Sequence, residues 1–441
     1  MHFPYLEFCA CAQRQTRCVS LVCSLLGWTL ATTLVPSSLA FAANPAEQPL
    51  SLTDAVALAE KASPAIVARQ AAAESAENAI SPAGALPDPQ LVVGVDNLPV
   101  STADAFSLTN DFMTMRKVGV MQEVTRGEKR HLRTERAQAA AARERALLTS
   151  EQLSVRESIA RAWIARATAE QKLKLLRELE PRAQAQVAAA TAALSAGRGT
   201  AADGIAAKTA QVMLADRISQ VEREVEDAHS EFARWLPEAG ERPLGDAPDW
   251  AVLGMDPDSL VANISHHREL AAYDAAEQMA NTDIALARAE KRPDWSVELD
   301  YAQRGPHYSN MISLEFRVGL PLFAAARQDP MIASKQAAAA QIEAEREDAR
   351  RMHTAELRKT IAAWRSARER VARYEHELIP LADDRAEATL AAYRGGRGDV
   401  QASLTALDQT IEQRIAYTDL LGALGQAWAM LHFAFPQEHR P

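Results

Sequence analysis

The stretch ISPAGALPDPQLVVGVDNLPV, residues 80–100, joins an alanine-rich segment to one in which large apolar residues alternate with small or polar ones. A Pro-Asp-Pro turn separates the two. Proline restricts the residue before it and suits a turn, so this pattern predicts a helix that ends at a corner and continues as a strand. The same corner recurs as ARAEKRPDWSVELDYAQRG at 287–305. The chain therefore builds it twice.

Other motifs also recur, at offsets between 199 (181 to 380) and 206 (88 to 294) residues. A nearly constant offset is typical of an internal duplication. We expect two structural repeats, 43–236 and 257–441, joined by a connector rich in Pro and Gly at 237–256. The matching pairs are Pro87-Asp88 with Pro293-Asp294, Val118-Gly119-Val120 with Val318-Gly319-Leu320, Ala162-Trp163 with Ala363-Trp364, Pro181 with Pro380, and Gly197-Arg198 with Gly396-Arg397.

Each repeat should run helix, strand, strand, very long helix, turn, helix. The first helix is expected at 52–80, capped by Ser51 or Thr53, and its copy at 259–290. The long helices are expected at 127–196 and 325–394, each about 100 Å long at 1.5 Å per residue. Pro181 and Pro380 should kink or break them in the same way.

The predicted strands lie at about 90–96, 113–124, 294–301 and 311–322. In the third, Trp295, Val297, Leu299 and Tyr301 alternate with polar residues. A half-buried soluble sheet would alternate too. A length of about 9 to 11 residues, with aromatic residues near the strand ends, favours strands that cross a lipid bilayer. Four strands cannot close a barrel and open edges are not tolerated in lipid, so three copies supplying twelve strands are expected.

Residues 1–42 have the features of a signal peptide. Arg14 and Arg17 precede an apolar run at 19–35, and small residues at 38–42 suit a cleavage site after Ala42. A membrane anchor is the alternative, although several Thr and Ser residues and one Pro interrupt the stretch from Arg17 to Ala42. The processed chain would then contain no thiol and hence no disulfide, Cys-based zinc site or Cys nucleophile. The four cysteines of the sequence, all inside this leader, are Cys9, Cys11, Cys18 and Cys23.

Composition and motifs also limit the class of function. The 441-residue chain carries a formal net charge of -10, so a nucleic-acid partner is not expected. His266-His267 and His353 lack partners at helical metal-ligand spacing. No catalytic triad, phosphate-binding Gly loop or HExxH motif is present in the sequence. We therefore expect neither an enzyme nor a bound cofactor.

The corner AGALPDP, the strand exit MTMRKVGVMQEVTRGEKR and the turn AYRGGRGDVQASLTAL resemble those of TolC-like outer-membrane efflux proteins. The AGALPDP and MTM…QEV patterns are similar to the heavy-metal branch of that family, the CzcC- and CusC-like proteins. The resemblance implies a fold that is mainly α-helical with a membrane β-barrel portion. It implies a homotrimer in which a twelve-strand barrel in outer-membrane lipid continues as an α-helical tunnel into the periplasm.

The resemblance also implies partners and a role. The trimer would dock on a periplasmic adaptor (membrane fusion) protein and an inner-membrane RND-type pump, and would passively conduct the pump's substrate, heavy-metal cations, to the exterior. One alternative is a duct of the same fold for drugs or other organic compounds. The other is a periplasmic adaptor, which would have one helical hairpin flanked by small Gly-rich β domains.

The two helix-to-helix turns are the first candidate site. By resemblance they form the periplasmic mouth of the tunnel, where the adaptor docks and acidic residues narrow the opening. By the same resemblance Asp203 matches an acidic position of the first turn, and it is hypothesised to pair with Arg397 across an interface. Ala402 and Thr405 stand where the best-known member of the family has carboxylates, so Asp399 is a candidate substitute. For the glycines, ordinary turn chemistry is an equally plain explanation. The candidates are Gly197, Arg198, Asp203, Gly396, Arg397 and Asp399.

The polar faces of the strands are the second candidate site, expected to face the lumen. A thioether is a soft ligand that suits Cu(I), so Met113, Met115 and Met121 are candidates for transient metal contact. Methionine is more often a packing residue, and no resident metal site is expected. The candidate lumen residues are Met113, Met115, Lys117, Met121, Glu298, Glu315 and Arg317.

Overall fold

A computed structural model describes residues 49–436. The predicted signal peptide, with its four cysteines, lies outside the described residues. The first half contains α1 (Leu52–Ala62), α2 (Pro64–Asn78), α3 (Ile80–Ala83), β1 (Gln90–Asp96), β2 (Met115–Val124), α4 (Gly127–Ser195) and α5 (Ala201–Trp235). The second contains α6 (Pro257–Ala262), the 3₁₀ turn η1 (Ile264–His266), α7 (Ala271–Ala289), β3 (Trp295–Gln303), β4 (Met311–Val318), α8 (Gln328–Arg373), the π turn η2 (Tyr374–Leu378), α9 (Ile379–Arg394) and α10 (Val400–His432).

The helix before the first corner is divided, whereas the sequence analysis expected one helix at 52–80. Ser51 caps α1 as expected, since its hydroxyl accepts a hydrogen bond from the Asp54 N–H at 3.1 Å. Ser63 has an extended backbone and Pro64 opens α2, because proline suits a first helical position and disfavours a helical residue before it. The expected helix at 259–290 is likewise divided, into α6, η1 and α7.

The two long helices respond differently to their prolines, so the prediction of equal kinks or breaks was wrong. Helix α4 runs unbroken for 69 residues with Pro181 inside it. In the second half the π turn η2 lies directly before Ile379 and Pro380, and it separates α8 from α9. A proline lacks an N–H and crowds the preceding turn, and a wider π turn accommodates both effects.

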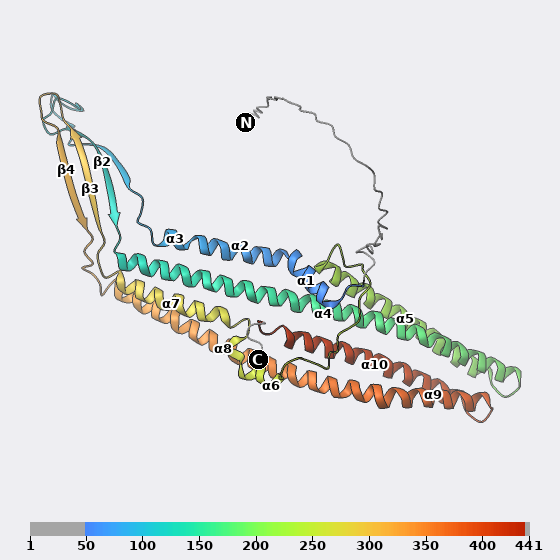
Figure 1. Cartoon of the computed structure of the whole chain (residues 1–441). Helices are drawn as coiled ribbons and strands as arrows, with labels where there is room; N and C mark the ends of the chain where they lie inside the picture. Colours follow the sequence, from blue (N-terminus) through green and yellow to red (C-terminus); the bar gives the residue numbers. More distant parts are fainter. Residues whose placement is uncertain (1–48, 437–441) are drawn as a thin grey trace, which may run out of the picture. The chain divides into compact units, whose positions relative to one another are not determined.

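Helix α4 is the element against which most others pack. Near the sheet it lies between α2 and α7, and α8 lies on the far side of α7. Towards the other end it packs against α5 and α10, and α10 packs in turn against α8 and α9 (Figure 1). None of the helices in residues 49–436 combines the length and the apolar character that crossing a membrane requires.

The strands form one antiparallel sheet in the order β1-β2-β3-β4. The central pair, β2 and β3, joins the two halves of the chain, with Val118 opposite Tyr301. The strands contain 7, 10, 9 and 8 residues, so β1 and β4 are shorter than the expected 9 to 11. Strand β4 ends at Val318 rather than at about 322 because its partner β3 begins opposite, at Trp295. The division into repeats at 43–236 and 257–441 stays a prediction.

The main core surrounds the connector between the two halves. Trp163 of α4 is fully buried, and its indole Nε1–H donates to the Leu50 carbonyl at 3.1 Å. Trp364 of α8, its match in the duplication, donates in the same way to the Trp250 carbonyl at 2.9 Å. Trp163 therefore holds the segment before α1, which bridges the connector at Leu244, and Trp364 holds the connector itself. Trp250 packs edge-on against Trp163 with ring centroids 6.3 Å apart.

Candidate functional site

One face of the sheet is apolar and exposed across all four strands. Leu91 and Val93 of β1 are each 72% exposed, and Ile312 of β4 is 76% exposed. A contiguous apolar surface of this kind is rare on a soluble monomer and marks contact with lipid or protein. The other exposed apolar residues of this face are Val95, Val118, Val120, Leu299, Tyr301, Leu314, Phe316 and Val318.

The opposite face of the sheet carries a network of charges. The Glu298 carboxylate, only 3% exposed, accepts from Arg317 at 2.6 Å and lies 3.6 Å from the Lys117 ammonium. Arg317 also binds Glu315 at 2.8 Å, and Lys117 lies 3.7 Å from Asp96. Arg317 Nη1 also donates to the Met121 sulfur at 3.5 Å. The structure thus brings together five predicted lumen residues: Lys117, Met121, Glu298, Glu315 and Arg317.

The network has two further members, Asp96 and Asp300, which the strand pattern places on the polar face but which were not among the candidate lumen residues. Asp300 is buried beside Glu298, and a methyl group added at Gly119 would come within 1.9 Å of its Oδ1, so only glycine fits there. Both aspartates alternate with apolar residues along predicted strands, and this alternation is the sequence signal that assigns them to the polar face.

The three candidate methionines are not gathered on one strand. Strand β2 begins at Met115, so Met113 precedes it and the prediction that places it on the pleat of β2 was wrong. The Met113 N–H instead donates to the Asp111 carboxylate at 2.7 Å, in the loop between β1 and β2. Met115 and Met121 lie six residues apart, which is about 20 Å along a strand. In residues 49–436 no cluster of three or more His, Cys, Asp or Glu side chains is placed to hold a metal ion.

A set of polar contacts fixes the second corner to the start of α4, and we call this set the repeat junction. The Asp294 carboxylate accepts from the Arg126 N–H at 2.9 Å and from the Lys129 ammonium at 2.8 Å. Lys129 also donates to Glu290 at 2.9 Å, and Arg126 Nε donates to the Pro293 carbonyl at 2.8 Å. Burial alone would lower the pKa of Lys129, but hydrogen bonds to the two carboxylates raise it above its ordinary value.

Replacing Lys129 by methionine should lower the free energy of unfolding by about 2 kcal/mol. The Lys129 side chain is 2% exposed, and its removal takes the ammonium donor from both Asp294 and Glu290, while Asp294 keeps the Arg126 N–H. Loss of one partner from a fully buried pair typically costs about 3 to 5 kcal/mol, and these carboxylates are partly solvated, so the effect is smaller. Because the folded-state pKa is raised, the contribution is complete below pH 10.5 and is lost as the pH rises further.

Urea unfolding of the detergent-solubilised protein, followed by circular dichroism, measures this loss. The matched control is Lys208→Met, which changes an exposed lysine of α5 and should leave the unfolding midpoint unchanged. Equal effects of the two substitutions would contradict a special contribution from the repeat junction.

The two helix-to-helix turns have the same backbone form. Gly197 and Gly396 adopt φ values of 68° and 71°, a region that favours glycine. The Arg198 N–H donates to the Ala193 carbonyl at 2.9 Å, and the Arg397 N–H donates to the Ala392 carbonyl at 3.0 Å. These bonds satisfy carbonyls at the helix ends, as in Schellman-type caps. The turn glycines are therefore explained by local geometry.

The two turns also lie against each other at the end of the helices away from the sheet (Figure 1). A methyl group added at Gly396 would come within 3.0 Å of Arg198 Nη1. Asp203 belongs to a capping box, in which its carboxylate accepts from the Thr200 N–H at 2.7 Å. Asp399 starts α10 and makes no side-chain capping bond. The six predicted turn residues thus gather at one end, while a role at a tunnel mouth stays a prediction.

Sequence reasoning missed Tyr393, which lies beneath both turns. The side chain is 7% exposed, and its hydroxyl has no hydrogen-bond partner among residues 49–436. Burial and the nearby charges of Asp203 and Asp399 raise the pKa of Tyr393 above its ordinary value. The pKa of this one buried tyrosine is therefore affected by an acidic residue from each turn.

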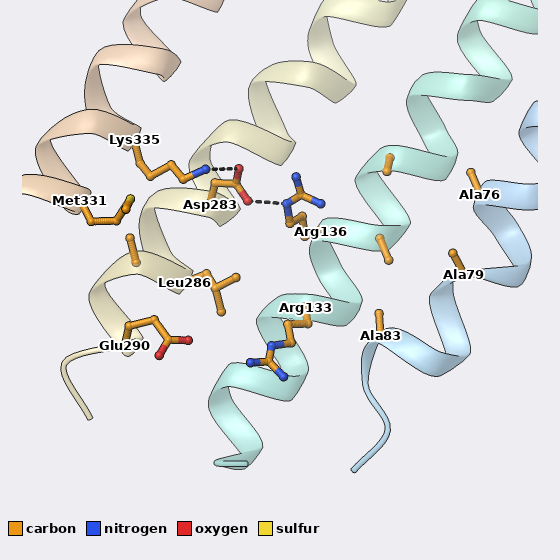
Figure 2. A pocket seen from close by; sticks show the side chains of 13 residues that line it. Ala76, Ala79, Ala83, Arg133, Arg136, Asp283, Leu286, Glu290, Met331 and Lys335 are labelled. Carbon is orange, nitrogen blue, oxygen red and sulfur yellow. Dashed lines mark hydrogen bonds and ion pairs between the residues drawn. The ribbon is translucent and has the colours of Figure 1, made fainter. Parts of the chain in front are cut away.

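A groove of about 650 Å³ lies on the helices next to the sheet. Figure 2 shows its small floor residues on α2, α3 and α4 and its charged residues on α4, α7 and α8. Asp283 of α7 binds Arg136 of α4 on one side and Lys335 of α8, at 3.2 Å, on the other. None of the lining residues is a Ser, Cys or His. The groove follows the seam between helices and includes no residue predicted for a site.

Comparison with known proteins shows likeness in structure alone. No family model and no curated protein matches the sequence. The chain is similar to solved CusC, described with transmembrane channel formation, at 14% identity and a TM-score of 0.73, covering 87% of this chain and 92% of CusC. The outer-membrane protein VceC of Vibrio cholerae is 16% identical with a TM-score of 0.73, and the match covers 87% of this chain and 95% of VceC. A membrane protein of Pseudomonas aeruginosa is 15% identical with a TM-score of 0.76, and the match covers 87% of this chain and 92% of that protein.

At these identities the likeness establishes the fold, and it confirms the predicted fold class. The chain therefore shares the fold of these solved membrane proteins, and it is mainly α-helical with one four-stranded antiparallel sheet.

Proposed function

We propose that this protein is the outer-membrane channel of a tripartite efflux system. The observation that carries the proposal is the sheet, which exposes apolar side chains on one face and gathers charges on the other. Lipid on the apolar face and water on the charged face would satisfy both surfaces. The similarity to solved membrane channels supports the same function.

The proposed channel is a homotrimer. Strands β1 and β4 are the two edges of the sheet, and each has one side without a partner strand among residues 49–436. Lipid offers no hydrogen bonds to open backbone groups, so the edges must pair with other copies. Three copies supply twelve strands, an even number within the range of bacterial outer-membrane barrels. The helices would then form the wall of a periplasmic tunnel.

The partners follow from the resemblance of the sequence to the TolC-like family. The two turns would form the tunnel mouth and meet a periplasmic adaptor protein, which connects the channel to an inner-membrane RND-type pump. An adaptor function for this chain is disfavoured, because each half of the sequence has its own pair of strands and its own helical hairpin.

Heavy-metal cations are the proposed substrate class, on the basis of the AGALPDP and MTM…QEV patterns. One observation favours the second candidate, a duct for drugs or other organic compounds. The charged face carries both signs, and its methionines do not cluster, so it has no evident preference for cations. Growth of a deletion strain on copper, silver, zinc, cadmium, cobalt and common drugs distinguishes the two. Sensitivity to drugs alone would exclude the metal assignment.

Removing the charges at the proposed mouth should change the channel current. If Asp203 and Arg397 narrow the opening by pairing between copies, Asp203→Ala and Arg397→Ala should each raise the single-channel conductance in a planar bilayer, by about twofold. Arg223→Ala, on an exposed part of α5, is the control and should leave the current unchanged. An unaltered current in both mouth variants would remove these two residues from the gate.

A further inference from the structure

We propose that Asp88 of one copy pairs with Arg327 of the next copy and fastens adjacent subunits at the base of the sheet. This inference rests on the homotrimer proposed above. Inside the chain, the Asp294 carboxylate accepts from the backbone N–H of Arg126, so a Pro-Asp corner lies beside an arginine that precedes a long helix. The same arrangement would recur across the subunit boundary. There the guanidinium of Arg327 would be the donor to Asp88, because the Arg327 N–H already donates to the Phe323 carbonyl at 3.1 Å. The observations that support it are the internal duplication, the strand order and the exposure of the two residues.

The repeat junction provides the template. Strand β2 pairs with β3, and this pairing brings the corner before β3 next to the segment that leaves β2. At that place Arg126, the residue directly before α4, donates its N–H to Asp294 and its Nε–H to the Pro293 carbonyl. An arginine at the start of a long helix therefore holds a Pro-Asp corner of the neighbouring repeat.

Both members of this contact have counterparts that stand apart within the chain. Pro87-Asp88 precedes β1 as Pro293-Asp294 precedes β3, and Arg327 directly precedes α8 as Arg126 precedes α4. The Asp88 and Arg327 side chains are exposed, and neither forms an ion pair or a side-chain hydrogen bond with any of residues 49–436. Each therefore offers a free charge of opposite sign.

The strand order brings the two together in a closed ring. Strands β4 and β1 are the open edges, so the boundary between copies pairs β4 of one copy with β1 of the next. The corner before β1 then lies beside the segment that leaves β4, as the corner before β3 lies beside the segment that leaves β2. Asp88 consequently meets Arg327.

Cross-linking tests the contact directly. The double variant Asp88→Cys with Arg327→Cys is treated in the assembled protein with a short bis-maleimide, because an Asp–Arg pair spaces its Cα atoms too widely for a disulfide. We expect a covalent trimer on a denaturing gel. The matched variant Arg126→Cys with Asp294→Cys should cross-link within the chain and run as a monomer. The wild-type chain and each single cysteine variant should give no trimer.

The outcomes separate this inference from the proposed function. If native mass measurement in detergent gives a trimer but the Asp88–Arg327 variant gives no covalent trimer, the pair is wrong while the assembly stands. If the chain is monomeric in detergent, both fail. Charge exchange gives a second measure. Asp88→Arg and Arg327→Asp should each raise the concentration at which half of the trimer dissociates by about tenfold. The double exchange should return this concentration to the wild-type value. Absence of restoration would also overturn the pair.

Discussion

Trp163→Ala is expected to reduce the free energy of unfolding by about 4 kcal/mol. The side chain is fully buried in the core around the connector, and its Nε1–H donates to the Leu50 carbonyl at 3.1 Å. Truncation of a buried tryptophan typically costs about 3 to 5 kcal/mol, because apolar contacts are lost and a cavity remains. Here the Leu50 carbonyl also loses its donor. Urea unfolding of the solubilised protein measures the effect.

Two further variants separate the contributions of size and hydrogen bonding. Trp163→Phe retains most of the ring but no donor, and should lose about 1 to 2 kcal/mol. Trp295→Ala removes a tryptophan that is 40% exposed on the sheet and should change stability much less. If Trp163→Ala and Trp295→Ala were equally mild, the core around the connector would not hold the two halves as described.

Acidification from pH 6.5 to pH 4 is expected to cost about 3 kcal/mol of stability through His267. Burial, together with the charges of His353 and Arg268, lowers the pKa of His267 to about 3. Between pH 6.5 and 3 the unfolded chain therefore binds a proton at this residue and the folded chain does not. Stability falls as the pH falls through this window, by about 1.4 kcal/mol per pH unit.

The His267→Gln variant isolates this contribution from those of the other acidic and basic groups of the chain. The ring stacks on His353 with centroids 4.4 Å apart, and its Nδ1 accepts from the Glu269 N–H at 3.4 Å. The variant should show a much flatter dependence of the unfolding midpoint on pH. His131→Gln, at a histidine that is 73% exposed, should retain the wild-type slope. A steep slope in both variants would assign the acid sensitivity to other groups.

The sequence predicted those parts of the fold that depend on local chemistry. The Pro-Asp corners, the alternating strands and the glycine turns could be read because each depends on a few adjacent residues. The break at Ser63 had a local signal too, since Ser-Pro is a helix cap followed by a first-position proline, and it was missed. The π turn before Pro380 had none, because Pro181 occupies a matched place in an unbroken helix.

For the candidate sites, the face of the sheet on which a residue lies could be predicted from the sequence, but the residues that it contacts could not. Alternation placed Glu298 and Arg317 on one side of the sheet. Their ion pair depends on the register of β3 against β4, which seats Arg317 opposite Ser296, diagonally beside Glu298. Tyr393 could not be identified, because it packs not only near α10 but also with residues of α4 and α5, which are distant in the sequence. Long-range register and packing are the information that adjacent residues do not contain.

The π turn at Tyr374–Leu378 makes the long helical segment of the second half, α8 to α9, differ from α4 in the first half. An extra residue in one turn rotates every later side chain by about 100° around the axis. Helix α4 keeps a single angular phase over its 69 residues, whereas α9 continues α8 out of phase. A stripe of side chains on α8 is therefore not continued on the same side of α9. Near the two helix-to-helix turns, the two halves of the duplicated chain can consequently direct matching side chains to different sides. Beside the sheet the two halves remain alike.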